Sequence, residues 1–291
     1  MTGLVYMYLL CSGLLLHCKQ TIKIADGVCL QAMPDYPPSF WVAAIIAATF
    51  IGIGKGGFGG GIVAITTPLV ALTIPVAEAA ALLLPILLFA DVFAVYSYRK
   101  SFDMPNLKLL IPCSIIGIVI ASLFFQSFNS NERVLKLGIG LIAVAFVLFQ
   151  LTRALILKRL ESTTLPKAWG VILGITAGFT STLAHVGAPP VLIYLLPQRL
   201  SKALFVGTNA VLFFVMNTVK LFAYAFLGLL TLGNLGITVI LIPIALLGTR
   251  LGVYLNRTVS EVFFNRFIYL MLFLTGVQLI AGRSLVSFFA R

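Results

Sequence analysis

The chain of 291 residues is 60% hydrophobic and only 10% charged, whereas about a quarter of the residues in an ordinary soluble domain are charged. Apolar runs of about 20 residues recur along its length, and each is long enough to cross a hydrocarbon core of about 30 Å. This excludes a soluble enzyme. Because the short alternating segments of a transmembrane β-barrel are missing, the pattern predicts an all-α, polytopic transmembrane helical bundle.

The formal net charge is +12, with 20 Lys and Arg against 8 Asp and Glu. In a soluble protein this excess would suggest nucleic-acid binding, but here the cations cluster between the apolar runs. Such clusters are typical of loops on the cytoplasmic side and of contact with anionic headgroups. We therefore expect membrane lipid as a partner and no nucleic acid. The four cysteines (Cys11, Cys18, Cys29 and Cys113) have no metal-binding spacing, so we expect no metal and no cofactor.

Residues 1–39 form the predicted N-terminal extension, with a short apolar segment at 4–16 followed by a polar, proline-containing connector. Three interpretations of the apolar segment stay open: a signal peptide, an extra membrane helix, or a misassigned start codon. The segment lacks a basic beginning and a small-residue cleavage site, which favours the extra helix.

Eight apolar segments follow the connector, and the first and fifth of them are interrupted by small residues. The segments are 40–73, 77–98, 107–126, 134–156, 168–197, 202–227, 232–255 and 263–282. A basic gap at 153–167 divides them near the middle. We therefore predict a first transmembrane repeat at 40–156, a basic cytoplasmic linker at 157–167 and a second repeat at 168–291.

The two halves carry the same features in the same order. Each begins with a glycine/proline-broken segment, continues with a helix that contains a deep polar residue, Asp91 or Asn217, and has a tyrosine seven residues later, Tyr98 or Tyr224. If each broken segment enters and leaves the membrane on one side, all the basic loops lie in the cytoplasm. These loops are 99–108, 153–167, 197–202 and 250–266. The arrangement predicts two inverted repeats, as in secondary transporters that bind substrate where broken helices meet. A discontinuous full crossing is the alternative.

The first broken segment contains "GIGKGGFGGG" at 52–61. Glycines destabilise a helix, and backbone N–H groups freed at a helix end bind anions, as a neighbouring lysine also does. We therefore predict substrate binding by Lys55, Gly56, Gly57 and Gly59. The alternative is that the glycines permit close helix packing while Lys55 reaches the membrane surface. A nucleotide-binding P-loop is excluded because GxxxxGK[ST] is absent.

The second broken segment carries Thr180, Ser181, Thr182 and His185 before "GAPP". Their hydroxyls could donate to an anion or satisfy unwound backbone, and the imidazole titrates near neutral pH. We place these four residues at the substrate site. The alternative is that the hydroxyls bond within their own helix and His185 is a neutral donor in the core.

Three further polar residues lie deep in apolar segments: Asp91, Asn217 and Lys220. Ionisable residues inside a membrane are usually functional and usually paired. We therefore predict that the three line the pathway or couple transport to an ion, with Asp91 or His185 taking a coupling proton. A structural Asp91–Lys220 ion pair is the other interpretation. Glu78 lies near a segment end and is expected at the membrane interface.

Several stretches together resemble the sulfite exporter TauE/SafE family. They are the glycine cluster 56–61 with Pro68, and residues 82–100, 185–200 and 205–228. The resemblance covers roughly 40–283. It implies movement of small anions such as sulfite or organosulfonates across the inner membrane, coupled to an ion gradient. The second broken segment departs from a simple glycine cluster, because it reads "TSTLAHVGAPP".

From the residues and the resemblance together we predict a secondary transporter, not an enzyme, that moves a small anion across the plasma membrane by alternating access. A passive anion channel with a lysine-lined constriction is the alternative. A membrane enzyme with His185 as base is disfavoured because no third orienting group is evident. Whether the protein forms a homo-oligomer stays open.

Overall fold

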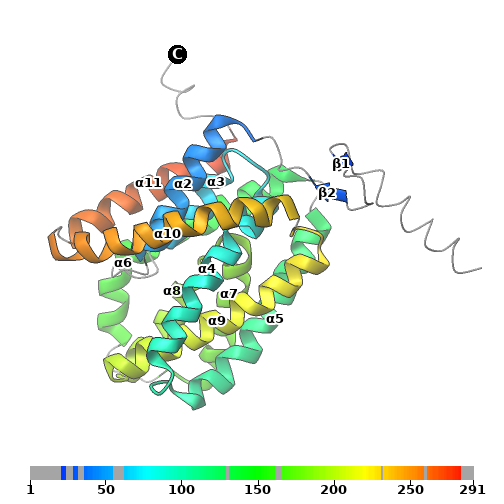
Figure 1. The fold of residues 1–291 in the computed structure, drawn as a ribbon. Coiled ribbons are helices and arrows are strands. Elements are labelled where there is room, and N and C mark those ends of the chain that lie inside the picture. Colours follow the sequence, from blue (N-terminus) through cyan, green and yellow to red (C-terminus); the bar gives the residue numbers. More distant parts are fainter. Residues whose placement is uncertain are drawn as a thin grey trace, which may run out of the picture.

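A computed structural model describes residues 21–23, 29–31, 36–54, 62–128, 131–160, 165–230, 232–258 and 261–282. Within these ranges the chain is almost entirely helical (Figure 1). The α-helices are α2 (Pro38–Ile53), α3 (Thr66–Val70), α4 (Val76–Tyr98), α5 (Met104–Phe128), α6 (Glu132–Leu160), α7 (Lys167–Ala184), α8 (Ala188–Leu195), α9 (Lys202–Phe226), α10 (Leu232–Thr258) and α11 (Glu261–Ala281). Two 3₁₀ turns, η2 (Val63–Ile65) and η3 (Leu196–Gln198), precede α3 and follow α8.

The predicted connector contains a small β-hairpin that the sequence pattern does not indicate. Strands β1 (Thr21–Lys23) and β2 (Cys29–Gln31) pair antiparallel, with Ile22 opposite Leu30. The apolar segment predicted at 4–16 lies outside the described residues.

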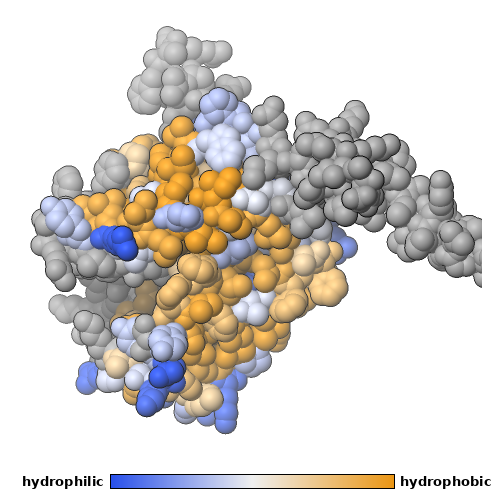
Figure 2. Space-filling model, viewed as in Figure 1, coloured by the Kyte–Doolittle hydropathy of each residue, from blue (hydrophilic) through white to orange (hydrophobic). Residues whose placement is uncertain are grey.

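Five helices of the described chain are long and apolar enough to span a membrane. These spans are Val76–Tyr96, Met104–Phe128, Glu132–Thr152, Ala203–Phe226 and Gly233–Gly252. The apolar helices Pro38–Ile53 and Ile268–Ala281 are shorter. Apolar side chains cover the middle of the face shown in Figure 2, and hydrophilic ones lie at its left and lower margins. The prediction of a helical, multi-pass membrane protein is therefore confirmed, with the β-hairpin of the connector as an addition.

Prolines and one aspartate define several helix starts. Pro37, Pro75 and Pro166 each stand immediately before a helix (α2, α4 and α7) in an extended conformation. Proline lacks the N–H that a preceding helical turn would need, so it suits this position. The carboxylate of Asp103 accepts the backbone N–H of Asn106 at 3.0 Å and so caps α5. The C-terminal end of α6 lies at Leu160, four residues beyond the segment predicted at 134–156.

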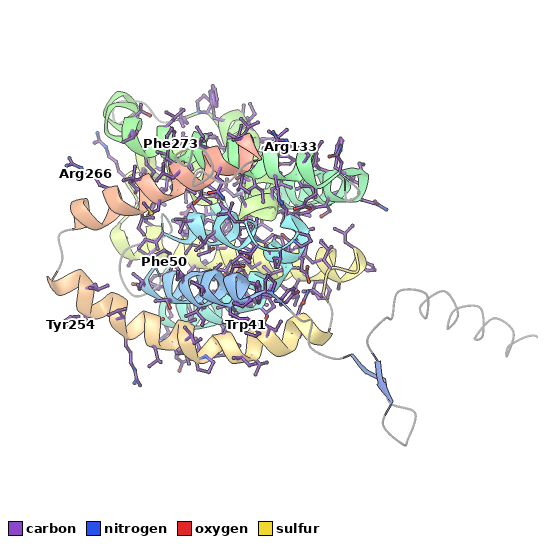
Figure 3. The ribbon with its side chains drawn as sticks, turned by 90° about the horizontal axis from the view of Figure 1, so that it is seen from above. Trp41, Phe50, Arg133, Tyr254, Arg266 and Phe273 are labelled. Carbon is purple, nitrogen blue, oxygen red and sulfur yellow. The ribbon has the colours of Figure 1, made fainter. Side chains whose placement is uncertain are left out.

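The helices associate in pairs that are distant in sequence. α2 lies along α10, as Figures 1 and 3 both show, and α11 lies beside α6 in Figure 3. In the same way α7 packs on α5, and α4 packs on α9. Glycines permit the closest contacts: a Cβ added at Gly52 would lie 2.0 Å from the carbonyl oxygen of Ala245, and one at Gly178 would lie 2.0 Å from that of Ser114. Small residues at such crossings let two backbones approach, which is how membrane helices gain packing energy.

Both predicted interruptions separate a longer helix from a short one. In the first half α2 ends at Ile53 and α3 begins at Thr66; in the second half α7 ends at Ala184 and α8 begins at Ala188. In each half the short helix packs against the longer helix that precedes it, α3 on α2 and α8 on α7. The breaks therefore bring each short helix back beside the helix it follows.

Candidate functional site

His185 ends α7 in a left-handed conformation. Its φ is 57°, and its backbone N–H donates to the Ser181 carbonyl at 3.0 Å. A residue with positive φ commonly terminates a helix, and histidine is one of the few residues other than glycine found there with some frequency. The side chain is 9% exposed, so it points into the protein at the break.

The imidazole connects the two broken segments. Its Nδ1 lies 2.9 Å from the hydroxyl Oγ1 of Thr67, which belongs to α3, and both side chains are buried. Thr67 is not among the site residues predicted from the sequence. The available signal was the hydroxyl pair Thr66–Thr67 directly before Pro68 in an apolar stretch, close after the glycine cluster.

The second ring nitrogen of His185 has no hydrogen-bond partner among the described residues. A buried polar atom without a partner costs about 1–3 kcal/mol, and such atoms are rare enough in folded proteins to require an explanation. The break therefore presents one polar atom, Nε2, that is available to a ligand.

Lys220 of α9 is fully buried and reaches the last turn of α7. Its Nζ donates to the Ser181 carbonyl at 3.1 Å and to the Ser181 hydroxyl at 3.0 Å. The end of a helix carries partial negative charge, which favours a cation there. One turn further along α9, the hydroxyl of Tyr224 donates to the Thr182 carbonyl. α9 therefore holds the end of α7 by a cation and by a phenol.

Asp91 and Asn217 meet between α4 and α9. The amide Nδ2 of Asn217 donates to Asp91 Oδ2 at 2.5 Å, and both residues are buried. Lys220, three positions after Asn217, interacts electrostatically with Asp91 and with His185. The structure thus brings the three predicted pathway residues to one helix interface, next to the break at His185.

The hydroxyls of Thr180 and Thr182 bond to backbone carbonyl groups close to them in sequence. Thr180 Oγ1 donates to the carbonyl oxygens of Val186 at 2.8 Å and Thr176 at 2.9 Å, and Thr182 Oγ1 donates to that of Gly178 at 2.8 Å. The bonds to Thr176 and Gly178 lie within α7, as the alternative interpretation expects, whereas Val186 belongs to the unwound backbone beyond the helix. Among the described residues, Ser181 is the one of the three whose side-chain hydroxyl forms a hydrogen bond with another helix, α9.

The predicted residues Lys55, Gly56, Gly57 and Gly59 lie outside the described residues. The chain enters and leaves that segment deep inside the protein, because Ile53 is 3% exposed and Ile62 is fully buried. In the described part of the chain, no group of three His, Cys, Asp or Glu side chains is placed to hold a metal ion.

A comparison with protein-family models matches residues 44–279 to the model described as sulfite exporter TauE/SafE. The chain belongs to this family. The match includes both broken segments, Thr67, His185 and the polar residues of α4 and α9. Comparisons with curated proteins and with solved structures found no match. The TauE/SafE assignment confirms the resemblance drawn from the sequence and makes this protein a member of a membrane transporter family.

Two further polar clusters of this TauE/SafE protein lie at the starts of α5 and α10. Asn106, the third residue of α5, exchanges hydrogen bonds of 2.7 and 3.2 Å with Gln198. Asn234, the third residue of α10, donates to Glu78 at 3.3 Å, and the Tyr36 hydroxyl donates to the same carboxylate. Burial, aided by the Glu78 carboxylate, raises the pKa of the Tyr36 phenol. Glu78, expected at the membrane interface, is thus a partner within a three-residue cluster.

Proposed function

We propose that this protein is a secondary transporter that moves a small anion, such as sulfite or an organosulfonate, across the plasma membrane by alternating access coupled to an ion gradient. The observation that carries the proposal is the His185 imidazole, which is buried at a helix break, contacts the other broken segment through Thr67 and keeps Nε2 available. The buried amine of Lys220 lies beside the same break, where it donates to the carbonyl and the hydroxyl of Ser181. A polar side-chain nitrogen and a lysine amine at a break between helices suit an anion.

The proposed architecture has eight membrane segments in two inverted repeats, 40–156 and 168–291, joined by a cytoplasmic linker at 157–167. The helix contacts support it. Suppose that α2, α3, α4, α5 and α6 correspond in this order to α7, α8, α9, α10 and α11. A two-fold axis then requires that a contact between two helices that do not correspond has a symmetry-related copy. The contact of α2 with α10 has such a copy in the contact of α7 with α5. Contacts between corresponding elements, α4 on α9 and α6 on α11, then lie on the axis. Asn106 and Asn234 are each the third residue of corresponding helices, α5 and α10, although their partners, Gln198 of η3 and Glu78 of α4, lie in elements that do not correspond.

In the proposed site the anion lies between the two breaks. Lys55 and the amides of Gly56, Gly57 and Gly59 hold it from the first. His185 holds it from the second, where proline occupies two positions in the first turn of α8 and so removes two of the N–H donors that a helix start normally offers. The imidazole replaces these missing donors.

The neighbouring hydroxyl residues Thr180, Ser181 and Thr182 give the second break its shape. The protons of both threonines are already donated to carbonyl groups, and Ser181 is held by Lys220. We assign Asp91, Asn217 and Lys220 to the pathway and to ion coupling, because they are buried together beside the break.

Uptake of sulfite into proteoliposomes tests the proposal. The wild-type protein is expected to show saturable uptake that responds to an imposed pH gradient, whereas a channel would show conductance. Lys55→Ala is expected to abolish uptake while folded protein remains in the membrane. Lys108→Ala, at an exposed position near the start of α5, is the matched control and is expected to transport normally. Normal transport by Lys55→Ala would overturn the site assignment.

A further inference from the structure

The contact between Thr67 and His185 allows two arrangements of protons. In the first, the Thr67 hydroxyl donates to Nδ1, so a neutral imidazole carries its proton on Nε2. In the second, Nδ1 carries the proton and donates to the Thr67 oxygen, which leaves Nε2 as a bare acceptor. The two oxygen and nitrogen atoms lie 2.9 Å apart in either case.

Counting unsatisfied groups distinguishes the arrangements. Thr67 is fully buried, and its hydroxyl has His185 as its hydrogen-bond partner among the described residues. In the second arrangement the hydroxyl proton of Thr67 has no acceptor and Nε2 has no donor, so two buried groups are unsatisfied. In the first arrangement only the N–H at Nε2 is unsatisfied. Burying fewer unsatisfied groups is more favourable, so the first arrangement prevails.

We propose that Thr67 is a positioning residue that fixes the tautomer of His185, so that Nε2–H becomes a permanent donor for an oxygen atom of an oxyanion substrate. The identity of the substrate as an oxyanion rests on the proposed function. The tautomer of His185 rests on the geometry of the Thr67 contact alone. The ligand class it specifies is an anion with an unprotonated acceptor oxygen, as in sulfite or an alkylsulfonate.

The same geometry argues against His185 as the group that takes the coupling proton. A proton added to His185 has to go to Nδ1, where it displaces the Thr67 donor and leaves that hydroxyl without an acceptor. It also adds a positive charge next to Lys220 of α9, the charged side chain that acts on His185. The short helices α3 and α8 contribute no charged side chain. His185 is therefore a fixed donor and not the group that takes up the coupling proton.

Nitrogen NMR of the labelled imidazole tests the tautomer directly. The chain has only two histidines, so His17→Gln leaves His185 as the only imidazole in the protein. The full chain with ¹⁵N-histidine is placed in lipid nanodiscs and recorded between pH 5.5 and 8, with and without sodium sulfite or methanesulfonate. We expect one neutral species, protonated at Nε2 and accepting a hydrogen bond at Nδ1, over the whole range, and a change of the Nε2 resonance when an anion is added.

Two substitutions isolate the Thr67 hydroxyl. Thr67→Val keeps the volume but removes the donor, so both neutral tautomers should appear, whereas Thr67→Ser should restore the single Nε2–H form. A purely structural role for Thr67 would leave the tautomer populations unchanged in the valine variant. That result would overturn the inference. An Nδ1–H tautomer or an imidazolium in the protein with native Thr67 would also overturn it. The spectrum of the protein with native Thr67 therefore tests the inference even if Thr67→Val does not fold.

Transport separates this inference from the proposed function. Sulfite affinity of Thr67→Val should fall in proportion to the lost fraction of the Nε2–H tautomer, about twofold when the two tautomers are equally populated. If the wild-type protein transports no anion but shows the Nε2–H tautomer, the proposed function fails and the role of Thr67 stands. If it transports sulfite with the Nδ1–H tautomer, the role of Thr67 fails and the function stands.

Discussion

Replacement of Lys220 by methionine is the most informative test of how the second break is held. Methionine has similar length and no charge, so it fills the space of the lysine stem with little change in packing. The substitution removes the hydrogen bonds of 3.1 and 3.0 Å to Ser181. It also leaves the buried carboxylate of Asp91 with less compensating positive charge.

The expected loss follows from these contacts. A hydrogen bond from a charged donor contributes about 1.5–3 kcal/mol, and removing one partner from a buried pair of charges costs about 3–5 kcal/mol. Because the two terms describe the same group, we expect about 3–5 kcal/mol in total. For a chain of 291 residues, an unfolding entropy of about 2.1 cal/mol/K per residue corresponds to about 1.6 °C per kcal/mol, so the apparent unfolding midpoint should fall by roughly 5–8 °C.

Thermal unfolding of the purified protein in detergent, followed by intrinsic fluorescence, measures this change. Lys136→Met is the matched control, because its ammonium lies 3.6 Å from Glu132 one helical turn away and its side chain is 32% exposed. An exposed pair of this kind contributes about 0.5 kcal/mol or less. If Lys220→Met lowers the midpoint no more than the control does, the reasoning about the buried cation is wrong.

A double substitution separates the two causes. Asp91→Asn removes the carboxylate that Lys220 compensates, so the loss in the pair Asp91→Asn, Lys220→Met should be smaller than the sum of the single losses. Additive losses would mean that Ser181, and not Asp91, accounts for the effect of Lys220.

Two further predictions concern packing and the cluster at α10. Gly178→Ala should lower the unfolding midpoint strongly, because the added Cβ would lie 2.0 Å from the Ser114 carbonyl oxygen, whereas Gly138→Ala, with its nearest neighbour at 3.9 Å, should not; equal midpoints would contradict the α5–α7 contact. For Tyr36, burial raises the pKa above the ordinary value of 10.0, so the stability it contributes is fully present below about pH 10 and is lost as the pH rises through the higher folded value. Tyr36→Phe should therefore lose this alkaline dependence in pH titrations of stability, and an unchanged titration would contradict the burial of the phenol.

Helix positions were predictable from sequence because apolar runs and membrane helices share one length scale. Glycine and proline in two of these runs also indicated breaks, and His185 lies at one of them, between α7 and α8. The gathering of Asp91, Asn217 and Lys220 was partly predictable, since one turn of α9 separates the last two and the predicted repeat relates the first two.

The contacts that define the second break could not be predicted, because they join residues far apart in the chain. The sequence contains no sign that Thr67 meets His185, or that Lys220 bonds to Ser181 as well as interacting with Asp91. The hydrogen bonds of the threonine hydroxyls, by contrast, are local. A carbonyl group one helical turn earlier is always within reach of a threonine hydroxyl, so Thr182 bonds to Gly178 whatever lies nearby. Backbone carbonyl groups close in sequence thus determine the hydrogen bonds of the threonine hydroxyls, and tertiary packing determines the contacts of His185 and Lys220.

The pairing of α2 with α10 also bears on synthesis of the chain. α2 is among the first helices of the bundle to leave the ribosome, yet the helix that covers its glycine face at Gly52 is synthesised almost last. Until α10 follows, that face can be covered only by lipid or by the insertion machinery. A chain interrupted after α6 would lack this cover and would expose the backbone at Gly52.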